Sequence, residues 1–244
     1  NIDWDCKVYR NYADENMGCK HRFVSGLDWV FEQVDEAIIL EDDCLPNNSF
    51  FRFQDAMIEK YRSDNRIMHV AGTNMGVDRS FEKNSYYFSK QTFIWGWGTW
   101  KRAWKKYDAK IEMWKNLRKE KNIWEDILVN ELEIKVRKKS WNRVFKGEID
   151  TWDYQWLFNV LVNGGMSVVP NDNLVSNIGF GIEAVHTSNT DSPFSNLPLE
   201  KMSFPINHPD TVLRDADADK EYIESMYCNS VSSYIKYVIK KICN

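Results

Sequence analysis

The stretch AIILEDDCLP, residues 37–46, decides the fold class of this chain. Its first four residues form a continuous apolar run, which is typical of a central strand of a parallel sheet that helices cover on both faces. Glu41, Asp42 and Asp43 follow directly, at the carboxyl end of that strand. Open α/β sheets bind their ligands at this edge. The stretch therefore predicts an α/β core with an acidic site at one edge of the sheet.

Apolar periodicity extends this core along the chain. We expect further strands at 3–10, 67–71, 86–88 and 166–169. We expect helices at 20–34, 49–62, 98–107, 122–138, 153–163, 217–227 and 230–242, with a loop-rich stretch at 171–215. The pattern predicts one α/β domain over residues 1–215 and a C-terminal helical extension over residues 216–244.

Composition and charge exclude several classes of protein. The formal net charge is −4 over 244 residues, which gives no electrostatic reason to bind nucleic acid. Five cysteines without a paired CxxC spacing argue against a disulfide framework and favour a reducing compartment. No apolar run approaches the roughly 20 residues of a membrane span, and no signal peptide is visible. We therefore expect a cytoplasmic protein.

Three consecutive carboxylates at a strand end suit a divalent cation. Like charges repel one another and are costly to gather beside a core. Mn²⁺ or Mg²⁺ offsets that repulsion, and such ions commonly use one or two carboxylates together with substrate phosphates. The triplet therefore favours a donor that carries a diphosphate, and its alternative interpretation is a solvated turn between strand and helix.

Residues 38–46, followed by Ser49-Phe50-Phe51-Arg52-Phe53, resemble the DxD region of GT-A glycosyltransferases. The resemblance is closest to the N-acetylglucosaminyltransferase I family and to bacterial nucleotide-diphospho-sugar transferases. It implies that Asp43 binds the metal and that Glu41 and Asp42 face the nucleotide. It also implies a nucleotide-sugar donor, for which a UDP-sugar is the first expectation.

Three further segments resemble the same family in the same order. They are Asn16-Met17-Gly18-Cys19, the aromatic stretch FIWGWGTW at 93–100, and WDYQW at 152–156 with the later Gly179-Phe180-Gly181 and Val185-His186. The resemblance implies a GT-A-like, Rossmann-type mixed sheet flanked by helices. GT-A folds open with a strand that holds the nucleotide base, and nothing before residue 3 supplies it. We therefore expect that first strand to be missing.

The resemblance also assigns roles near the second acidic position. Asp153 is expected to be the general base that deprotonates the acceptor, with Asp150 as the alternative base and Tyr154 as a neighbouring substrate contact. An acid in the first turn of a helix is also stabilised by the helix dipole alone. His186, in a glycine-rich loop, is expected to bind the metal or the diphosphate, since a neutral imidazole can do either.

Four tryptophans lie between residues 95 and 104. Trp97, Trp100 and Trp104 have helical spacing, which favours a helix buried by its tryptophan face. Gly96 and Gly98 make the start of this stretch a poor helix, and glycine allows close approach of a ligand. We therefore predict that Trp95, Trp97 and Gly98 bind substrate and that the later tryptophans belong to the core.

Together these features predict a metal-dependent hexosyl- or N-acetylhexosaminyltransferase of polysaccharide biosynthesis. It would move a sugar, with inversion, from a nucleoside-diphosphate donor to a glycan or lipid-linked glycan. The alternatives are a non-catalytic carbohydrate-binding relative and a metal-dependent phosphohydrolase. The segment 230–242 has an apolar stripe beside lysines, so it either packs on the body or lies at the inner face of a membrane.

Overall fold

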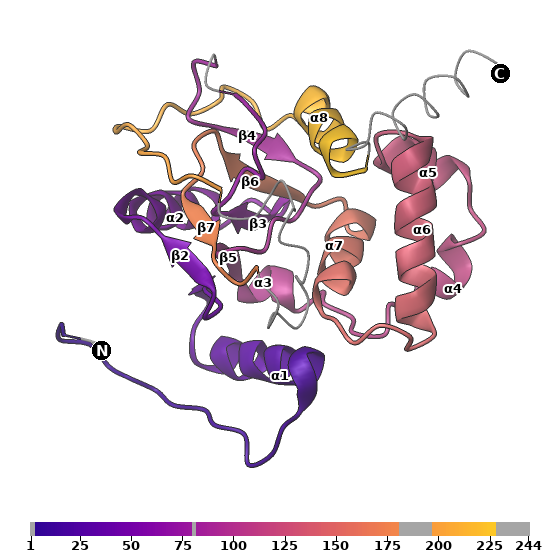
Figure 1. Ribbon diagram of the computed structural model, residues 1–244, viewed down its shortest axis with the longest axis horizontal. Coiled ribbons are helices and arrows are strands. Elements are labelled where there is room, and N and C mark those ends of the chain that lie inside the picture. The colour runs from indigo at the N-terminus through magenta and orange to yellow at the C-terminus, as the bar shows by residue number, and fades with distance from the viewer. Residues whose placement is uncertain (1–2, 80–81, 181–196, 228–244) are drawn as a thin grey trace.

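The computed structural model describes residues 3–79, 82–180 and 197–227, and a five-stranded mixed sheet lies at its centre (Figure 1). The strands in spatial order are β1 (Glu36–Ile39), β5 (Trp97–Trp100), β3 (Ile67–Ala71), β6 (Met166–Pro170) and β4 (Tyr86–Ser89). β5 is antiparallel to β1 and β3, β6 is parallel to β3, and β4 is antiparallel to β6. The carboxyl ends of β1, β3 and β6 therefore share one edge, at which β5 begins.

A two-stranded ribbon and eight helices complete the described part of the chain. The ribbon pairs β2 (Cys44–Pro46) with β7 (Val175–Asn177), antiparallel to each other. The helices are α1 (Gly18–Gln33), α2 (Asn48–Tyr61), α3 (Lys101–Trp104), α4 (Trp114–Leu117), α5 (Asn122–Ile127), α6 (Glu131–Phe145), α7 (Asp153–Val162) and α8 (Ala216–Tyr227).

One face of the sheet packs against α2. The side chain of Asn47 caps this helix by accepting from the backbone N–H of Phe50 at 3.1 Å. Phe50 and Phe53 are fully buried in one cluster with strand residues that include Val70. Gly98 of β5 lies directly beneath the helix. A Cβ at this position would come within 2.8 Å of the Ile58 side chain, so the close packing of α2 requires glycine here.

A column of stacked rings joins the opposite face of the sheet to α1 and α7. Phe23 of α1 lies 3.6 Å from Trp152 between ring centroids, with an interplanar angle of 8°. Trp152 stacks in turn on Trp97 at 5.7 Å, and Trp97 stacks on His69 of β3 at 4.9 Å. We call these four residues the aromatic column. It joins two helices and two strands at the residue that precedes Asp153.

His69 closes the aromatic column with two hydrogen bonds. Its Nδ1 accepts from the indole Nε1 of Trp156 at 3.1 Å, so its Nε2 carries the proton and donates to the carbonyl oxygen of Phe93 at 2.9 Å. Burial lowers the pKa of His69 to about 3. The imidazole is therefore neutral and serves as a fixed structural link between β3, α7 and the segment before β5.

A second apolar cluster lies away from the sheet, between α7 and the helices α4, α5 and α6. Trp114, Trp124 and Trp141 are fully buried there and surround Phe158 of α7 with ring centroids 5.3–6.2 Å away. Three indoles supply a large apolar area to a charged segment of sequence. These helices therefore form an annex packed on α7.

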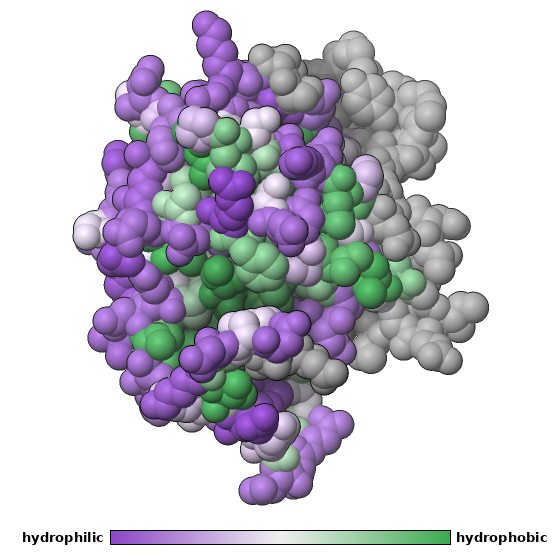
Figure 2. Space-filling view, turned by 90° about the vertical axis from the view of Figure 1, so that its left-hand side faces the viewer, coloured by the Kyte–Doolittle hydropathy of each residue, from purple (hydrophilic) through white to green (hydrophobic). Residues whose placement is uncertain are grey.

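Apolar side chains are also visible at the surface. Figure 2 looks onto the side of the molecule that carries α2 and β2, and shows apolar side chains gathered in the middle of a polar face. Phe51 of α2 and Leu45 of β2 are 46% and 49% exposed. Individual exposed apolar residues are common on protein surfaces and do not by themselves indicate function.

Most expected elements are confirmed, and several are corrected. The segment predicted as a strand at 3–10 has no regular secondary structure and is exposed, since it pairs with no other strand of the described chain. The run at 37–40 gives an edge strand, not a central one, and leaves Ile38 38% exposed. The expected helix at 122–138 is split into α5 and α6, because Asn130 caps a new helix by accepting from Glu133 N–H at 3.0 Å.

The expected helix at 98–107 is also wrong in its first half. Residues 97–100 form strand β5, and only Lys101–Trp104 is helical. Three residues apart on a strand, Trp97 and Trp100 point to opposite faces. Trp97 therefore joins the aromatic column, while Trp100 packs in the cluster beneath α2.

The C-terminal prediction is confirmed in part. The expected helix at 217–227 corresponds to α8, and the expected helix at 230–242 lies outside the described residues. Over residues 3–79, 82–180 and 197–227, no helix has both the length and the apolar character that crossing a bilayer requires.

The aromatic column predicts a large loss of stability on its disruption. Trp97→Ala should lower the free energy of unfolding by about 3–5 kcal/mol, because it removes a fully buried indole and leaves a cavity. Urea denaturation of the purified protein measures this loss. Trp4→Ala, at a site that is 66% exposed, is the control and should change stability by no more than about 0.5 kcal/mol. Equal midpoints for wild type and Trp97→Ala would contradict the central place of this indole.

Candidate functional site

The acidic triplet forms the turn between β1 and β2. The backbone N–H of Cys44 donates to the carbonyl oxygen of Glu41 at 3.2 Å and closes this turn. Asp42 is exposed, whereas Glu41 and Asp43 are half-buried. The turn lies at the edge where β1, β3 and β6 end, so the structure places the triplet at the sheet edge that the sequence predicted.

Strand β7 and the residues after it cover Asp43. The backbone N–H of Ile178 donates to the carbonyl oxygen of Asp43 at 2.9 Å. Gly179 lies so close to the Asp43 carboxylate that a Cβ there would collide with Oδ2. Glycine at this position therefore allows the backbone to approach the acid closely.

Asp150 and Asp153 approach the triplet from the far half of the chain. Asp150 Oδ2 lies 3.1 Å from the position that a Cβ of Gly18 would occupy, at the start of α1. Desolvation raises the pKa of the neighbouring Cys19 thiol, and the charges of Glu41, Asp150 and Asp153 raise it further. These three carboxylates therefore gather around the N-terminus of α1.

Glu41 carries the clearest electrostatic signature of this acidic cluster. Burial, as the largest cause, and then the charges of Asp43, Asp153 and Asp42 in that order together raise its pKa to about 7. Asp153 thus lies close enough to the triplet for its charge to raise the pKa of Glu41, although more than 100 residues separate them in sequence. A cation or a proton relieves the repulsion in such a cluster.

The oxygen ligands at this edge are of the kind that Mn²⁺ and Mg²⁺ prefer. Among the residues with described positions, no three His, Cys, Asp or Glu side chains form a ready-made metal-binding group. A site that uses one or two carboxylates and completes its shell with substrate phosphates needs no such group. Asp43 therefore stays the ligand that the resemblance implies, and His186 lies outside the described residues.

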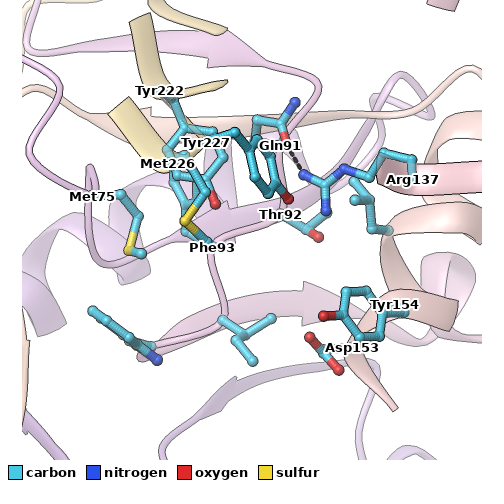
Figure 3. Close-up of a pocket in the computed structure, with 13 residues that line it drawn as sticks. Met75, Gln91, Thr92, Phe93, Arg137, Asp153, Tyr154, Tyr222, Met226 and Tyr227 are labelled. Atoms are coloured by element: carbon cyan, nitrogen blue, oxygen red, sulfur yellow. Dashed lines mark hydrogen bonds between the residues drawn. The ribbon is translucent and has the colours of Figure 1, made fainter. Parts of the chain in front are cut away.

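A pocket of about 200 Å³ opens beside Asp153 (Figure 3). The segment before β5 and the helices α6, α7 and α8 supply its walls. Its lining residues are Met75, Gln91, Thr92, Phe93, Ile94, Trp95, Arg137, Asp153, Tyr154, Leu157, Tyr222, Met226 and Tyr227. The structure therefore brings three of the sequence-predicted site residues, Trp95, Asp153 and Tyr154, to one pocket.

Other parts of the tryptophan prediction are wrong. Trp97 is fully buried in the aromatic column, so its indole has no surface to offer a sugar. Gly98 is buried beneath α2 and accommodates helix packing, not a ligand. Trp95 differs from both, since it is half-buried, lines the pocket and meets Phe180 edge-on at 5.6 Å between centroids.

The sequence analysis missed a polar network on the α6 wall of the pocket. Gln91 Nε2 donates to Glu133 Oε1 at 2.8 Å, and Arg137 Nη2 donates to Gln91 Oε1 at 2.7 Å. All three side chains are buried. A glutamate four residues before an arginine is typical of an exposed helix face, so the sequence pattern pointed away from burial. The aromatic wall from α8, including Tyr222 and Tyr227, gave no signal beyond helix periodicity.

The raised pKa of Glu41 predicts a pH-dependent penalty on stability. Unfolded glutamate titrates near pH 4.3, so the cost of the buried charge is absent below that pH, grows as pH rises, and is complete above about 7. Glu41→Gln lacks this cost. In EDTA its melting temperature should match wild type at pH 4 and exceed it at pH 8 by about 2–4 °C, the effect of about 1 kcal/mol in a chain of this size.

Differential scanning fluorimetry across this pH range measures the shift. Glu32→Gln on α1, an exposed position, is the matched control and should show no pH-dependent gain. A Glu41→Gln melting temperature equal to wild type at pH 8 would show that the folded protein does not penalise this charge.

No protein-family model matches this chain, and no curated protein matches its sequence. The resemblance to glycosyltransferases therefore rests on the residues of the chain itself.

Proposed function

We propose that this chain is a metal-dependent, inverting glycosyltransferase of the GT-A type. It would transfer a sugar from a nucleoside-diphosphate donor, first of all a UDP-sugar, to a glycan or lipid-linked glycan. The observation that carries the proposal is the position of Asp153. The charge of this carboxylate helps to raise the pKa of Glu41 in the acidic turn. The same carboxylate lines the neighbouring pocket.

The architecture supports the same proposal. A mixed sheet with helices on both faces places the triplet at the shared carboxyl ends of its strands, where α/β proteins bind ligands. The segment at 178–180 packs against Asp43, and the segment before β5 supplies Trp95 to the pocket. All four motifs that resemble the family thus contribute residues near one edge of the sheet.

The acidic turn is the donor side in this proposal. Asp43 would hold Mn²⁺ or Mg²⁺ together with the donor diphosphate, with Glu41 and Asp42 beside it. When bound, the cation compensates the negative charge that develops on the departing nucleoside diphosphate. The half-buried position of Asp43 under Gly179 would keep its carboxylate in one orientation.

Asp153 is the base in this proposal. A base must lie within hydrogen-bond reach of the hydroxyl that attacks the anomeric carbon, and it accepts the proton as the new bond forms. The Thr151 hydroxyl donates to Asp153 Oδ1, which leaves Oδ2 for the acceptor. The preceding Trp152 is fixed in the aromatic column, so the backbone that carries the base is held firmly. The pocket next to it would then receive the acceptor.

A carbohydrate-binding protein without transferase activity is the second candidate. The half-buried Trp95 and the aromatic wall of the pocket favour it, because aromatic faces suit the apolar faces of sugars. It would not need the cluster of Glu41, Asp43 and Asp153. The two substitutions described next separate the candidates.

Asp43→Ala should abolish Mn²⁺-dependent binding of UDP while the fold is kept. The carboxylate is a proposed ligand, and no neighbouring side chain of the described chain completes a metal-binding group in its place. Isothermal titration calorimetry of UDP with and without Mn²⁺ measures the effect. Asp55→Ala, an exposed acid on α2, is the control and should bind as wild type does. Unchanged binding by Asp43→Ala would exclude the proposed donor site.

Asp153→Asn should lower kcat for sugar transfer by about 10²–10⁴-fold, because the amide keeps the shape but cannot accept the proton. The affinity for the donor should stay nearly unchanged, which marks an interaction made in the transition state. Initial rates with a panel of UDP-sugars and monosaccharide acceptors provide the measurement. Asp150→Asn is the matched control. Near-full activity of Asp153→Asn together with loss in Asp150→Asn would move the role of base to Asp150.

A further inference from the structure

We propose that the pocket beside Asp153 binds a sugar that carries a negatively charged group, which the guanidinium of Arg137 recognises. The class of ligand is an acidic monosaccharide unit, with either a carboxylate or a phosphate. That this ligand is the acceptor rests on the function proposed above, whereas the anion site itself rests on the geometry of the pocket.

Arg137 is buried in an unusual place. It lies on α6 in the row of buried residues that contains Glu133, Trp141 and Val144. Only 8% of its side chain is exposed, and that surface belongs to the wall of the pocket. Burying a guanidinium is costly unless its charge is paired and its N–H groups are hydrogen-bonded. The partners of Arg137 therefore decide whether its role is structural alone.

Hydrogen bonds to the described residues do not use the whole guanidinium. Its five N–H groups make two hydrogen bonds, from Nε to Glu133 Oε1 at a long 3.5 Å and from Nη2 to Gln91 Oε1 at 2.7 Å. The remaining three N–H groups make no hydrogen bond to another described residue, although the phenols of Tyr154, Tyr222 and Tyr227 lie near the guanidinium. Figure 3 shows the guanidinium, bonded to Gln91, pointing into the pocket on the side across from Asp153 and Tyr154.

The counter-charge of Arg137 lies behind it, away from the pocket. Glu133 is fully buried and does not line the pocket. Its Oε1 also accepts from Gln91 Nε2 at 2.8 Å, and its Oε2 accepts from the backbone N–H of Val129 at 2.9 Å. The carboxylate is thus held in place by three donors and fixes the guanidinium from the Nε side. Nη1 and the second N–H of Nη2 remain available for an anion, which guanidinium groups bind through paired N–H donors.

The other walls of the pocket indicate the chemistry of the rest of the ligand. Phe93, Trp95, Tyr222 and Tyr227 supply aromatic faces, which suit the apolar faces of a sugar ring. Asp153 lies across the pocket from Arg137, so the two sides carry opposite charge. A ligand that satisfies both places a hydroxyl at the carboxylate and an anionic group at the guanidinium. An acidic sugar has both groups on one ring.

Binding of monosaccharides, measured by NMR titration of the purified protein, tests this inference. Glucuronate, glucose 6-phosphate and glucose are the probes. Wild type should bind at least one of the charged sugars roughly tenfold or more tightly than glucose, the contribution expected of hydrogen bonds to a charged group. Arg137→Met should remove this preference. Arg143→Met, on an exposed part of the same helix, should retain it.

The pattern among probes distinguishes the two sources of charge. A preference for glucuronate identifies a carboxylate site, and a preference for glucose 6-phosphate alone identifies a phosphate site. Equal binding of all three sugars by wild type, or an unchanged preference in Arg137→Met, would overturn the proposal. The comparison among ligands on wild type needs no variant, so it stays decisive even where Arg137→Met fails to fold.

The anion site and the proposed transferase function can each be wrong while the other is right. Loss of the anion preference would leave Mn²⁺-dependent UDP binding through Asp43 untouched. Conversely, failure of UDP binding with the anion preference intact would identify a protein that binds acidic sugars without acting as a transferase.

Discussion

The stacking of Trp152 on Trp97 is the contact on which the rest of the site depends. It joins the N-cap residue of α7 to strand β5, and Phe23 and His69 extend it to α1 and β3. Asp153 follows Trp152 directly, so the position of its carboxylate relative to the β1 edge is set by ring packing. Stacked aromatic pairs contribute about 0.5–1.5 kcal/mol beyond the area they bury. The neutral state of His69 belongs to the same constraint, because protonation at Nδ1 would break its hydrogen bond from Trp156.

Charged side chains of opposite sign lie on the two sides of Asp153, next to the aromatic column. One side of Asp153 holds an acidic cluster in which burial and neighbouring charges raise the pKa of Glu41, and the other holds the guanidinium of Arg137. The buried charge of Glu41 does not favour the folded state by itself, since it is costly to bury among like charges. The apolar clusters on both faces of the sheet and in the helical annex offset that cost. Proteins commonly accept such local destabilisation at functional sites.

Sequence reasoning located the acidic turn and most of the elements because both depend on local patterns. An apolar run followed by three acids predicts a strand end whatever the neighbours are, and helical periodicity locates α1, α2 and α7. Sequence reasoning failed where packing against a distant segment of the chain determines the place of a residue. The run at 37–40 reads as a central strand but has one strand neighbour in the described sheet. Trp97 has the glycine neighbours of a binding loop, yet its role follows from stacking between Trp152 and His69. Arg137 has the spacing of a surface ion pair and is buried because α6 packs on the segment before β5.

The contribution of α8 to the pocket has a consequence for synthesis on the ribosome. The acidic turn at residues 41–43 is synthesised before Tyr222, Met226 and Tyr227 of α8. Chains grow at about 5–20 residues per second and fold from the N-terminal side first. A nascent chain therefore carries the carboxylates of the acidic turn for roughly 10 to 35 s before the opposite wall of the pocket exists. The pocket wall that α8 supplies therefore forms only after this helix has been made.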